Sequence, residues 1–337
     1  MPVRVAINGF GRVGRCALRS AFEADAPIEW VGINDVADVE TLAHLLRHDT
    51  VYGPFPGVVD TDGSTLVVDD VRIPVTAIAD PGNLPWSATE VDVVLECSGK
   101  FRARADAARH LDAGARKVIV SAPGKGVDAT IVRGVNDEAY DPDVHDVISN
   151  ASCTTNCLAP VAKVLNETFG IRHGTMTTIH AATGDQRVVD LPHKDLRRAR
   201  AASANIIPTS TGAASALGLV IPELAGKLHG IAARVPVLTG SLVDLTVELE
   251  REVTVEEIQV AFADAAGNGL DGILAISYEP LVSSDVIKSP YSAVVDGELV
   301  TVVDGTQAKV IAWYDNEWGY ATRLVELAQR VLVPAAV

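Results

Sequence analysis

The sequence predicts an α/β protein of two domains: a doubly wound parallel sheet, followed by an α+β domain with a mostly antiparallel sheet. The length of 337 residues is about that of two ordinary domains. As far as Ser149, short apolar runs alternate with helical patterns, which is typical of parallel βαβ units. After Ser149 the predicted strands follow one another with few helices between them, which favours antiparallel pairing.

The N-terminal segment contains one complete predicted βαβ unit. Residues Val3 to Ile7 are apolar and β-branched and predict a strand, the glycines that follow predict a turn, and Cys16 to Phe22 has helical spacing. A second strand is predicted from Ile28 to Ile33. The helix after it begins behind Asp38, which is a typical N-cap residue.

The rest of the first domain continues the alternation. An Ala-rich stretch, 103–113, predicts a helix, and further strands are predicted at 91–95, 117–120, 129–132 and 144–148. The stretch from Leu66 to Ile78 is different, because Asp69-Asp70 between two β-rich runs predicts a hairpin.

In the second domain a long helix is predicted from Ala151 to Leu165, and another begins near Val255 behind Thr254. The predicted strands are 174–180, 229–237 and 242–250, and a final helix is predicted over 318–333. The polar section from Thr183 to Asn205 is long for a connection, so we expect it to bind a ligand or contact another subunit.

Composition excludes several classes of function. The formal net charge of −16 argues against binding of nucleic acid or an anionic membrane, because both depend on clustered Lys and Arg. The N-terminus leads directly into a strand, and no apolar run approaches the length of a membrane span. The 4 cysteines are scattered, unlike a disulfide framework. We therefore expect a cytoplasmic protein with reduced thiols.

The first chemistry-bearing motif is Gly9-x-Gly11-x-x-Gly14, which follows a predicted strand and opens a helix. Asp35 comes at the end of the second predicted strand, as a carboxylate for ribose hydroxyls should. This is the context of a Rossmann-type dinucleotide site. Because a carboxylate there repels a 2′-phosphate, the cofactor should be NAD rather than NADP.

The second motif, SNASCTTNCLAP, places Cys153 near the start of a helix, where a thiolate is favoured. Cys153 is therefore a candidate nucleophile. Cys157 lies one turn later, but no other Cys or His cluster completes a metal site, so we expect no metal. His180 ends a predicted strand in the same domain and is a candidate base, since cysteine chemistry usually needs a nearby imidazole.

A third group is basic. Arg234 stands in an apolar run and needs an anionic partner, which is either a phosphorylated substrate or an internal carboxylate. The loop adds a cluster of cations within an otherwise acidic protein: Arg187, Lys194, Arg197, Arg198 and Arg200.

Together these motifs resemble the phosphorylating glyceraldehyde-3-phosphate dehydrogenase family, from INGFGRVGR at Ile7 to WYDNEWGY at Tyr320. The most specific segments are SNASCTTNCLAP and the later HAATGDQRVVDLPHKDLRRARAASANIIPTSTGAA. The resemblance implies an NAD-binding domain of residues 1–150 completed by a C-terminal helix, 316–337, and a catalytic domain of residues 151–315. It also implies a homotetramer.

Carried over residue by residue, the resemblance makes Cys153 the nucleophile and His180 the activating base. The residues it implies for the substrate and inorganic phosphate are Ser152, Thr154, Thr183, Arg198, Thr211, Gly212 and Arg234. Those it implies for NAD, besides Gly9, Gly11 and Gly14, are Arg12, Val13, Asp35, Ser121 and Asn316. The chain departs from the family's common pattern at Ala79, Ala182 and Thr239-Gly240-Ser241.

The implied reaction converts glyceraldehyde 3-phosphate, NAD and inorganic phosphate to 1,3-bisphosphoglycerate and NADH through a thioester on Cys153, in either metabolic direction. Two alternatives remain at this stage. One is an erythrose-4-phosphate dehydrogenase, which would share the nucleophile and the nucleotide domain. The other is a non-catalytic scaffold that keeps the dinucleotide fold.

Overall fold

The computed structural model describes residues 2–332, which divide into two compact units. Unit 1 contains the chain up to Ile131, residues 137–151, and the chain from Ala321 onward. Unit 2 contains residues 132–136 and 152–320. The domain boundary predicted from the sequence did not place the short segment 132–136 with the second unit. The predicted end of the last helix, at Val333, lies outside the described residues.

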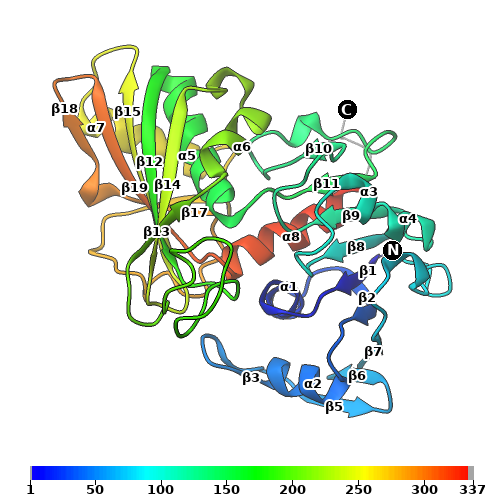
Figure 1. The fold of residues 1–337 in the computed structure, drawn as a ribbon. Coiled ribbons are helices and arrows are strands. Elements are labelled where there is room, and N and C mark those ends of the chain that lie inside the picture. Colours follow the sequence, from blue (N-terminus) through cyan, green and yellow to red (C-terminus); the bar gives the residue numbers. More distant parts are fainter. Residues whose placement is uncertain (1, 333–337) are drawn as a thin grey trace. The chain divides into compact units, whose positions relative to one another are not determined.

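Unit 1 is built on a nine-stranded sheet in the order β10-β11-β9-β8-β1-β2-β7-β6-β5 (Figure 1). Every pair from β10 to β7 is parallel, and β7-β6-β5 is antiparallel. The bounds are β1 (Val3–Asn8), β2 (Ile28–Asn34), β5 (Val59–Asp62), β6 (Thr65–Val68), β7 (Val71–Thr76), β8 (Val93–Glu96), β9 (Lys117–Val120), β10 (Ala129–Thr130) and β11 (Val147–Ser149). A separate small ribbon pairs β3 (His48–Asp49) with β4 (Gly53–Pro54).

Both faces of this sheet are covered, which confirms the doubly wound prediction. Val5 and Ile7 of β1 pack into one core with helical residues such as Leu18 and Leu324, whereas Ala6 packs with Trp86 in a separate cluster. Neighbouring side chains of a strand point to opposite faces, so the two clusters lie on opposite sides of the sheet. The helices are α1 (Arg12–Glu23), α2 (Val39–Arg47), α3 (Arg104–Ala107), α4 (Arg109–Asp112) and the greater part of α8 (Trp318–Arg330), with short 3₁₀ turns η1 (Pro81–Asn83) and η2 (Asp137–Ala139).

Local predictions in unit 1 have mixed outcomes. The Asp38 cap is confirmed, since its side chain accepts a hydrogen bond from the Thr41 amide at 2.8 Å. The hairpin is confirmed as β6 and β7, with Asp69 in the left-handed region at φ 51°. The single helix predicted over 103–113 is instead the two short helices α3 and α4.

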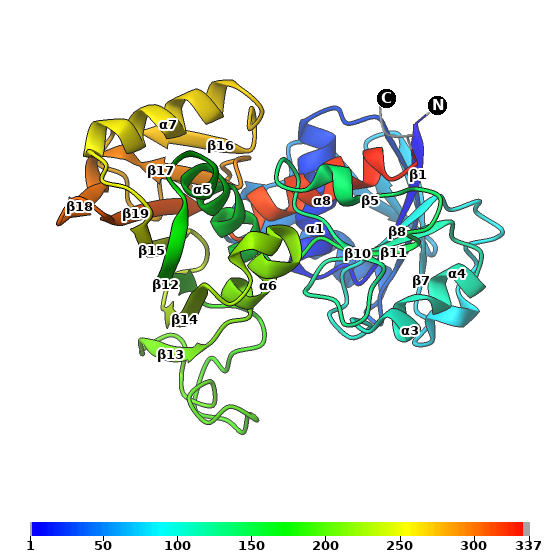
Figure 2. The same ribbon diagram turned by 90° about the horizontal axis from the view of Figure 1, so that it is seen from above.

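Unit 2 contains an eight-stranded sheet in the order β13-β14-β12-β15-β19-β17-β16, with β18 also paired to β19. The strands are β12 (Ile171–Ala181), β13 (Ile207–Ser210), β14 (Leu228–Val235), β15 (Ser241–Leu249), β16 (Leu274–Ser277), β17 (Ala293–Asp296), β18 (Thr301–Val303) and β19 (Gln307–Tyr314). The helices that cover it are α5 (Cys153–Phe169), α6 (Ala213–Val220) and α7 (Val255–Gly267), with turns η3 (Pro222–Leu224) and η4 (Gly297–Leu299) (Figure 2).

The sheet of unit 2 is mostly antiparallel, as predicted, but two of its pairs are parallel. These are β12 with β14 and β16 with β17. Between β12 and β14 the chain passes through the long loop, β13 and α6, and a connection of that length can return it in the same direction. The sequence pattern predicted the strands β12 and β14. It did not predict the connection that makes them parallel, because β13 and α6 were not predicted. The parallel pairing has a direct effect on the site.

Candidate active site

The glycine turn of unit 1 needs each of its three glycines for a different reason. Gly9 has φ +93°, and an added Cβ would lie 2.4 Å from the backbone nitrogen of Ser98. At Gly14 a Cβ would lie 2.4 Å from the carbonyl oxygen of Gly9, so this glycine allows helix and strand to pack. At Gly11 a Cβ would meet open space. Gly11 is the N-cap of α1 without a side-chain cap, so a negatively charged ligand can approach the first backbone N–H groups of the helix.

Asp35 follows β2, and the turn holds its carboxylate in place. Its Oδ2 accepts from the Phe10 amide at 2.7 Å, and its Oδ1 accepts from the Ala37 amide at 3.1 Å. A cavity runs beside it, lined by Gly9, Gly11 and Asp35 among others. Each carboxylate oxygen retains a lone pair for a ribose hydroxyl. Open space at Gly11, exposed helix N–H groups and an anchored carboxylate fit NAD.

The other predicted NAD residues have varied surroundings. Arg12 and Val13 are the first two residues of α1, but the Arg12 guanidinium pairs with Asp49, so its backbone rather than its charge is at the helix start. Ser121 follows β9 and donates its hydroxyl to the Glu96 carbonyl at 2.9 Å. Asn316 belongs to unit 2.

Sequence reasoning missed a buried polar network beside this cavity. Glu96, at the end of β8, accepts from Asn8, from the hydroxyl and amide of Ser98, and from His110 Nε2 at 3.0 Å. Trp86 donates to His110 Nδ1 at 3.0 Å, which leaves the proton of a neutral ring on Nε2, facing Glu96. The signal for this network in the sequence was a glutamate at the end of the apolar strand VVLE. The network ties together Asn8 and Ser98, which both line the cavity.

Cys153 is the first residue of α5. Ser152 is the N-cap and accepts from the Thr155 amide at 3.1 Å, and Ala151 before it is in the left-handed region at φ 54°. This turn brings the thiol next to the end of β12, where its Sγ lies 3.4 Å from His180 Nε2. The structure therefore brings together the nucleophile and the base predicted from separate motifs.

Burial opposes ionisation of the thiol. It is the largest influence on the pKa of Cys153 and raises it, while the charge of Arg234 acts in the opposite direction. Our expectation that the helix start lowers this pKa took no account of burial, and the pKa is instead raised above its ordinary value. The thiolate therefore depends on its charged and hydrogen-bonding neighbours.

Arg234 contacts the other side of His180. The two residues are register partners in the parallel strands β12 and β14, and Arg234 Nη1 lies 2.6 Å from His180 Nδ1 and 3.0 Å from the Ala181 carbonyl. An arginine can only donate, so Nδ1 is the acceptor here and the ring proton is on Nε2, facing Cys153. Burial, together with the charge of Arg234, lowers the pKa of His180 to about 3, so the ring is neutral at pH 7.

The structure also tests the internal-carboxylate alternative for Arg234. Within residues 2–332, no carboxylate lies within ion-pair distance of this guanidinium, and its buried Nε has no hydrogen-bond partner. A partly buried cation without a carboxylate partner favours an external anion.

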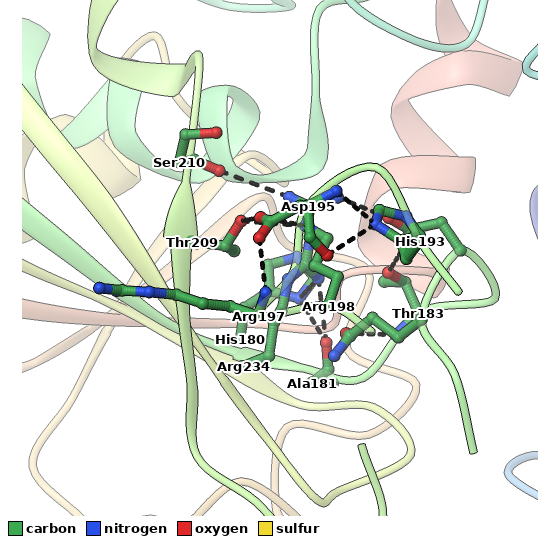
Figure 3. Close-up of polar contacts among 12 residues, drawn as sticks. His180, Ala181, Thr183, His193, Asp195, Arg197, Arg198, Thr209, Ser210 and Arg234 are labelled. Carbon is green, nitrogen blue, oxygen red and sulfur yellow. Dashed lines mark hydrogen bonds and ion pairs between the residues drawn. The ribbon is translucent and has the colours of Figure 1, made fainter. Parts of the chain in front are cut away.

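A second arginine lies in the same group of side chains (Figure 3). Arg198, from the long loop, donates from Nε to Thr209 at 2.9 Å and from Nη1 to Asp185 at 2.5 Å. Asp185 also accepts from the hydroxyl of Thr183. Thr183, Arg198 and Arg234 are thus drawn together from the loop and β14, as the resemblance implied.

The remaining predicted anion-binding residues differ in what their side chains can offer. The Ser152 hydroxyl caps α5, and the buried Thr154 hydroxyl contacts Tyr314 at 3.0 Å. Thr211 and Gly212 form the start of α6, with Gly212 as N-cap without a side-chain cap. Ser152 and Thr154 could reach an anion through the backbone, whereas at the start of α6 the Thr211 hydroxyl accepts from the Ala213 amide at 3.2 Å.

Asn316 is held by hydroxyl groups at the position where this chain departs from the common family pattern. Its Oδ1 accepts from Ser241 at 2.8 Å and from Thr239 at 3.3 Å. Ser241 in turn accepts from the amide of Ala181, the residue after the base. The two hydroxyls therefore fix the orientation of the Asn316 amide and connect it to the strand that carries His180.

Cys157 has a supporting environment. It is fully buried, its Sγ lies 3.7 Å from the Ala312 carbonyl, and burial raises its pKa well above the ordinary value. Across the described part of the chain, no group of three or more His, Cys, Asp and Glu side chains could hold a metal ion. In the same residues, no helix is long and apolar enough to span a membrane.

The dinucleotide turn of unit 1 and the Cys153–His180 pair of unit 2 define the class of NAD-binding dehydrogenases that have a cysteine nucleophile. Two family models match: the NAD binding domain of glyceraldehyde 3-phosphate dehydrogenase over residues 3–104, and its C-terminal domain over residues 152–316. The chain belongs to the glyceraldehyde-3-phosphate dehydrogenase family.

Full-length relatives agree with this assignment. The chain is 57% identical over 328 residues to a glyceraldehyde-3-phosphate dehydrogenase of Geobacillus stearothermophilus, which covers 97% of this chain and 98% of the relative. It is 55% identical, with the same coverage, to glyceraldehyde-3-phosphate dehydrogenase 1 of Bacillus subtilis. It is 53% identical over 327 residues to glyceraldehyde-3-phosphate dehydrogenase 2 of Streptomyces avermitilis, again with 97% and 98% coverage.

Proposed function

We propose that this chain oxidises glyceraldehyde 3-phosphate with NAD and inorganic phosphate, giving 1,3-bisphosphoglycerate and NADH. The observation that carries the proposal is the Cys153–His180 contact at 3.4 Å beside Arg234, a partly buried cation without a carboxylate partner. Phosphorylation, rather than hydrolysis, is supported by a second cation, Arg198, because the reaction needs to hold two anions. Residues 1–150 with 316–337 are assigned to NAD binding, and residues 151–315 to catalysis.

The covalent steps follow from the chemistry of the side chains. The sulfur of Cys153 adds to the aldehyde carbon while the thiol proton passes to the aldehyde oxygen, which gives a hemithioacetal. The hydroxyl proton of that group is transferred to Nε2 of His180 as the carbon is oxidised. When bound, NAD accepts the hydride that leaves this carbon. An oxygen of inorganic phosphate then attacks the thioester carbon, the C–S bond breaks, and the Cys153 thiolate leaves.

His180 needs a free Nε2 to accept that proton. In the geometry described above Nε2 carries the ring proton, because Arg234 donates to Nδ1. The other tautomer requires Nδ1 to donate, and the Ala181 carbonyl lies 2.8 Å away to receive it. Arg234 must then turn its donor elsewhere. A bound substrate or phosphate anion supplies that acceptor, so anion binding and activation of the base are linked through one guanidinium.

The binding roles are assigned as follows. The α1 start and Asp35 hold the NAD pyrophosphate and ribose, with Asn316 orienting the nicotinamide carboxamide. Thr183, Arg198, Thr211, Gly212 and Arg234 hold the two anions, with Ser152 and Thr154 contributing backbone. NAD is preferred to NADP because Asp35 would face the 2′-phosphate and the loop residues Leu191-Pro192 offer it no polar group.

A homotetramer is the proposed assembly. The loop between β12 and β13 exposes apolar side chains, with Val188 73%, Leu196 81% and Ile206 71% exposed. Exposed apolar patches of this kind mark contact surfaces. Sedimentation velocity at micromolar concentration should give a single species of four chains, and a monomer would contradict the assignment. A cytoplasmic location is proposed on the 4 free cysteines.

One assay tests the activity. Purified protein should reduce NAD with glyceraldehyde 3-phosphate only when phosphate or arsenate is present, and much more slowly with NADP. Equal rates with and without phosphate would point to a non-phosphorylating enzyme. The same assay with erythrose 4-phosphate addresses the other aldehyde, which no relative named above supports. Failure to form a thioester would favour the scaffold alternative.

A further inference from the structure

We infer that Asp185 sets the affinity of the phosphate-binding group by competing with the bound anion for Thr183 and Arg198. The inference rests on the proposed function. It extends that function by naming the group in this chain that an incoming anion must displace.

The contacts of Asp185 carry the inference. One carboxylate oxygen accepts from the Thr183 hydroxyl, and the other accepts from Arg198 Nη1 at 2.5 Å. Both donors are assigned to a phosphate in the proposed function. A carboxylate offers a guanidinium the same pair of acceptor oxygens as one edge of a phosphate. Asp185 therefore occupies these donors as an anion would (Figure 3 shows Thr183 and Arg198 within the group).

The charges of the group agree with competition. Arg198 has a second carboxylate, Asp195, at 3.7 Å, but Asp195 is committed to the Thr209 hydroxyl and the Arg197 amide. Burial by itself raises the pKa of Asp185, yet the Thr183 hydroxyl and the charges of Arg198 and Arg234 outweigh it and lower the pKa. The Asp185 carboxylate is thus ionised at neutral pH and repels an approaching phosphate.

Two observations show how an exchange could occur. The Asp185 side chain is 46% exposed, so the carboxylate can turn into water when its donors are taken. The Arg234 guanidinium contacts His180 and the Ala181 carbonyl rather than a carboxylate, and this gives an arriving anion a positive charge that Asp185 does not hold. Phosphate can therefore begin to bind at Arg234 and then take Arg198 and Thr183 from Asp185. The expected result is weaker phosphate binding than two arginines alone would give, and faster release.

The test compares inorganic phosphate binding to the unmodified protein and to Asp185→Asn by isothermal titration calorimetry. Asparagine keeps the size of the side chain and removes its charge. The Kd for phosphate should fall about five- to tenfold, as expected for one unit charge in a partly screened site. The KM for phosphate should fall by a similar factor, and the Kd for NAD should not change.

Asp190→Asn is the matched control. It removes the same charge from the same loop, but Asp190 pairs with Arg200 at 2.9 Å and not with the anion-binding residues. It should leave the Kd for phosphate within about twofold of the unmodified value, whereas a fall as large as that of Asp185→Asn would mean that only overall charge matters. Such a result would overturn the inference.

Unchanged or weaker phosphate binding by Asp185→Asn, at an unchanged melting temperature, would also overturn it, because Asp185 would then position Arg198 for the anion. If the melting temperature of Asp185→Asn is lower than that of the unmodified protein, Asp185→Ser is used instead, because it removes the carboxylate with a smaller side chain. Tighter phosphate binding by Asp185→Ser would again support the inference, and unchanged or weaker binding would overturn it. Failure of the proposed function is visible separately, since the unmodified protein would then neither bind phosphate nor make an acyl phosphate.

Discussion

The chain contains two regions suited to anions, and they use different means. In unit 1 the start of α1 offers backbone N–H groups behind Gly11, and the Arg15 guanidinium donates to the Phe10 carbonyl of the turn at 2.9 Å. In unit 2 the proposed anion site depends on two guanidinium groups, Arg198 and Arg234, and Arg198 already pairs with Asp185. Backbone dipoles are fixed once the helix forms, whereas side-chain charges can be shared, exchanged and coupled to other groups.

This difference matches the tasks proposed for the two regions. A cofactor that is bound and released as a whole requires only a fixed complement for its pyrophosphate. A substrate phosphate and an attacking phosphate have to come and go during each turnover, and one of their arginines also contacts the base. Substitutions in unit 2 should therefore change the chemical steps, whereas substitutions beside the start of α1 should change only cofactor binding.

The largest effect should come from Cys153→Ser. An alkoxide is far harder to form at neutral pH than a thiolate, so NAD reduction should fall by roughly 10⁴-fold or more, while NAD binding measured by fluorescence quenching stays intact. Cys157→Ser is the control, because that thiol is fully buried and faces Ala312. Preferential labelling of Cys157 by iodoacetamide, or appreciable turnover in Cys153→Ser, would show that Cys153 is not the nucleophile.

His180→Asn should lower turnover by roughly 10²–10⁴-fold, the usual effect of losing a positioned base, and move alkylation of Cys153 to higher pH. It also has a stability signature. The pKa of His180 is about 3 in the fold, against an ordinary 6.5, so the unfolded chain binds a proton between these values and the folded chain does not. Stability therefore falls as pH drops from about 6.5 towards 3. In His180→Asn the melting temperature should fall less over this pH range. If the melting temperatures of the variant and the unmodified protein depend on pH in the same way, another group is responsible for the loss of stability.

Arg234→Leu should raise the KM for both glyceraldehyde 3-phosphate and phosphate by roughly 10- to 100-fold, because one guanidinium serves both anions through charged hydrogen bonds. It should also raise the pKa of His180, since the charge of Arg234 helps to lower it. The acid limb of the pH–rate profile should then move to higher pH. Arg197→Leu removes an equal charge from an exposed position nearby and serves as the comparison. Normal saturation by both ligands in Arg234→Leu would make this arginine structural.

The smallest effect is expected in the backbone region. Asp35→Gly should weaken NAD about tenfold, through loss of the carboxylate and of its anchors to the Phe10 and Ala37 amides, and it should narrow the preference over NADP by removing repulsion. The KM values for phosphate and aldehyde should not move. Steady-state kinetics with both cofactors measures this, and equal kcat/KM for NAD and NADP in the unmodified enzyme would remove the basis of the assignment.

The sequence by itself determined the parts of this protein that depend on local spacing. The three glycines and Asp35 follow from one strand–turn–helix pattern, and the structure shows a steric reason for Gly9 and Gly14 and open space beside Gly11. The Asp38 and Thr254 caps also follow from adjacent residues, Thr254 forming a complete capping box with Glu257. Such features are predictable because the interacting groups are a few residues apart and the backbone fixes their distance.

Only the tertiary structure decided how the catalytic groups meet. His180 and Arg234 are 54 residues apart, and they touch because β12 and β14 are parallel register partners, a pairing that the strand pattern did not predict. The Tyr314 contact with Thr154 and the hydroxyls that hold Asn316 likewise join distant segments. Burial also reversed the expected sign for the pKa of Cys153. Periodicity and motifs encode which residues are present, but contact across strands and removal from water are properties of the packed chain.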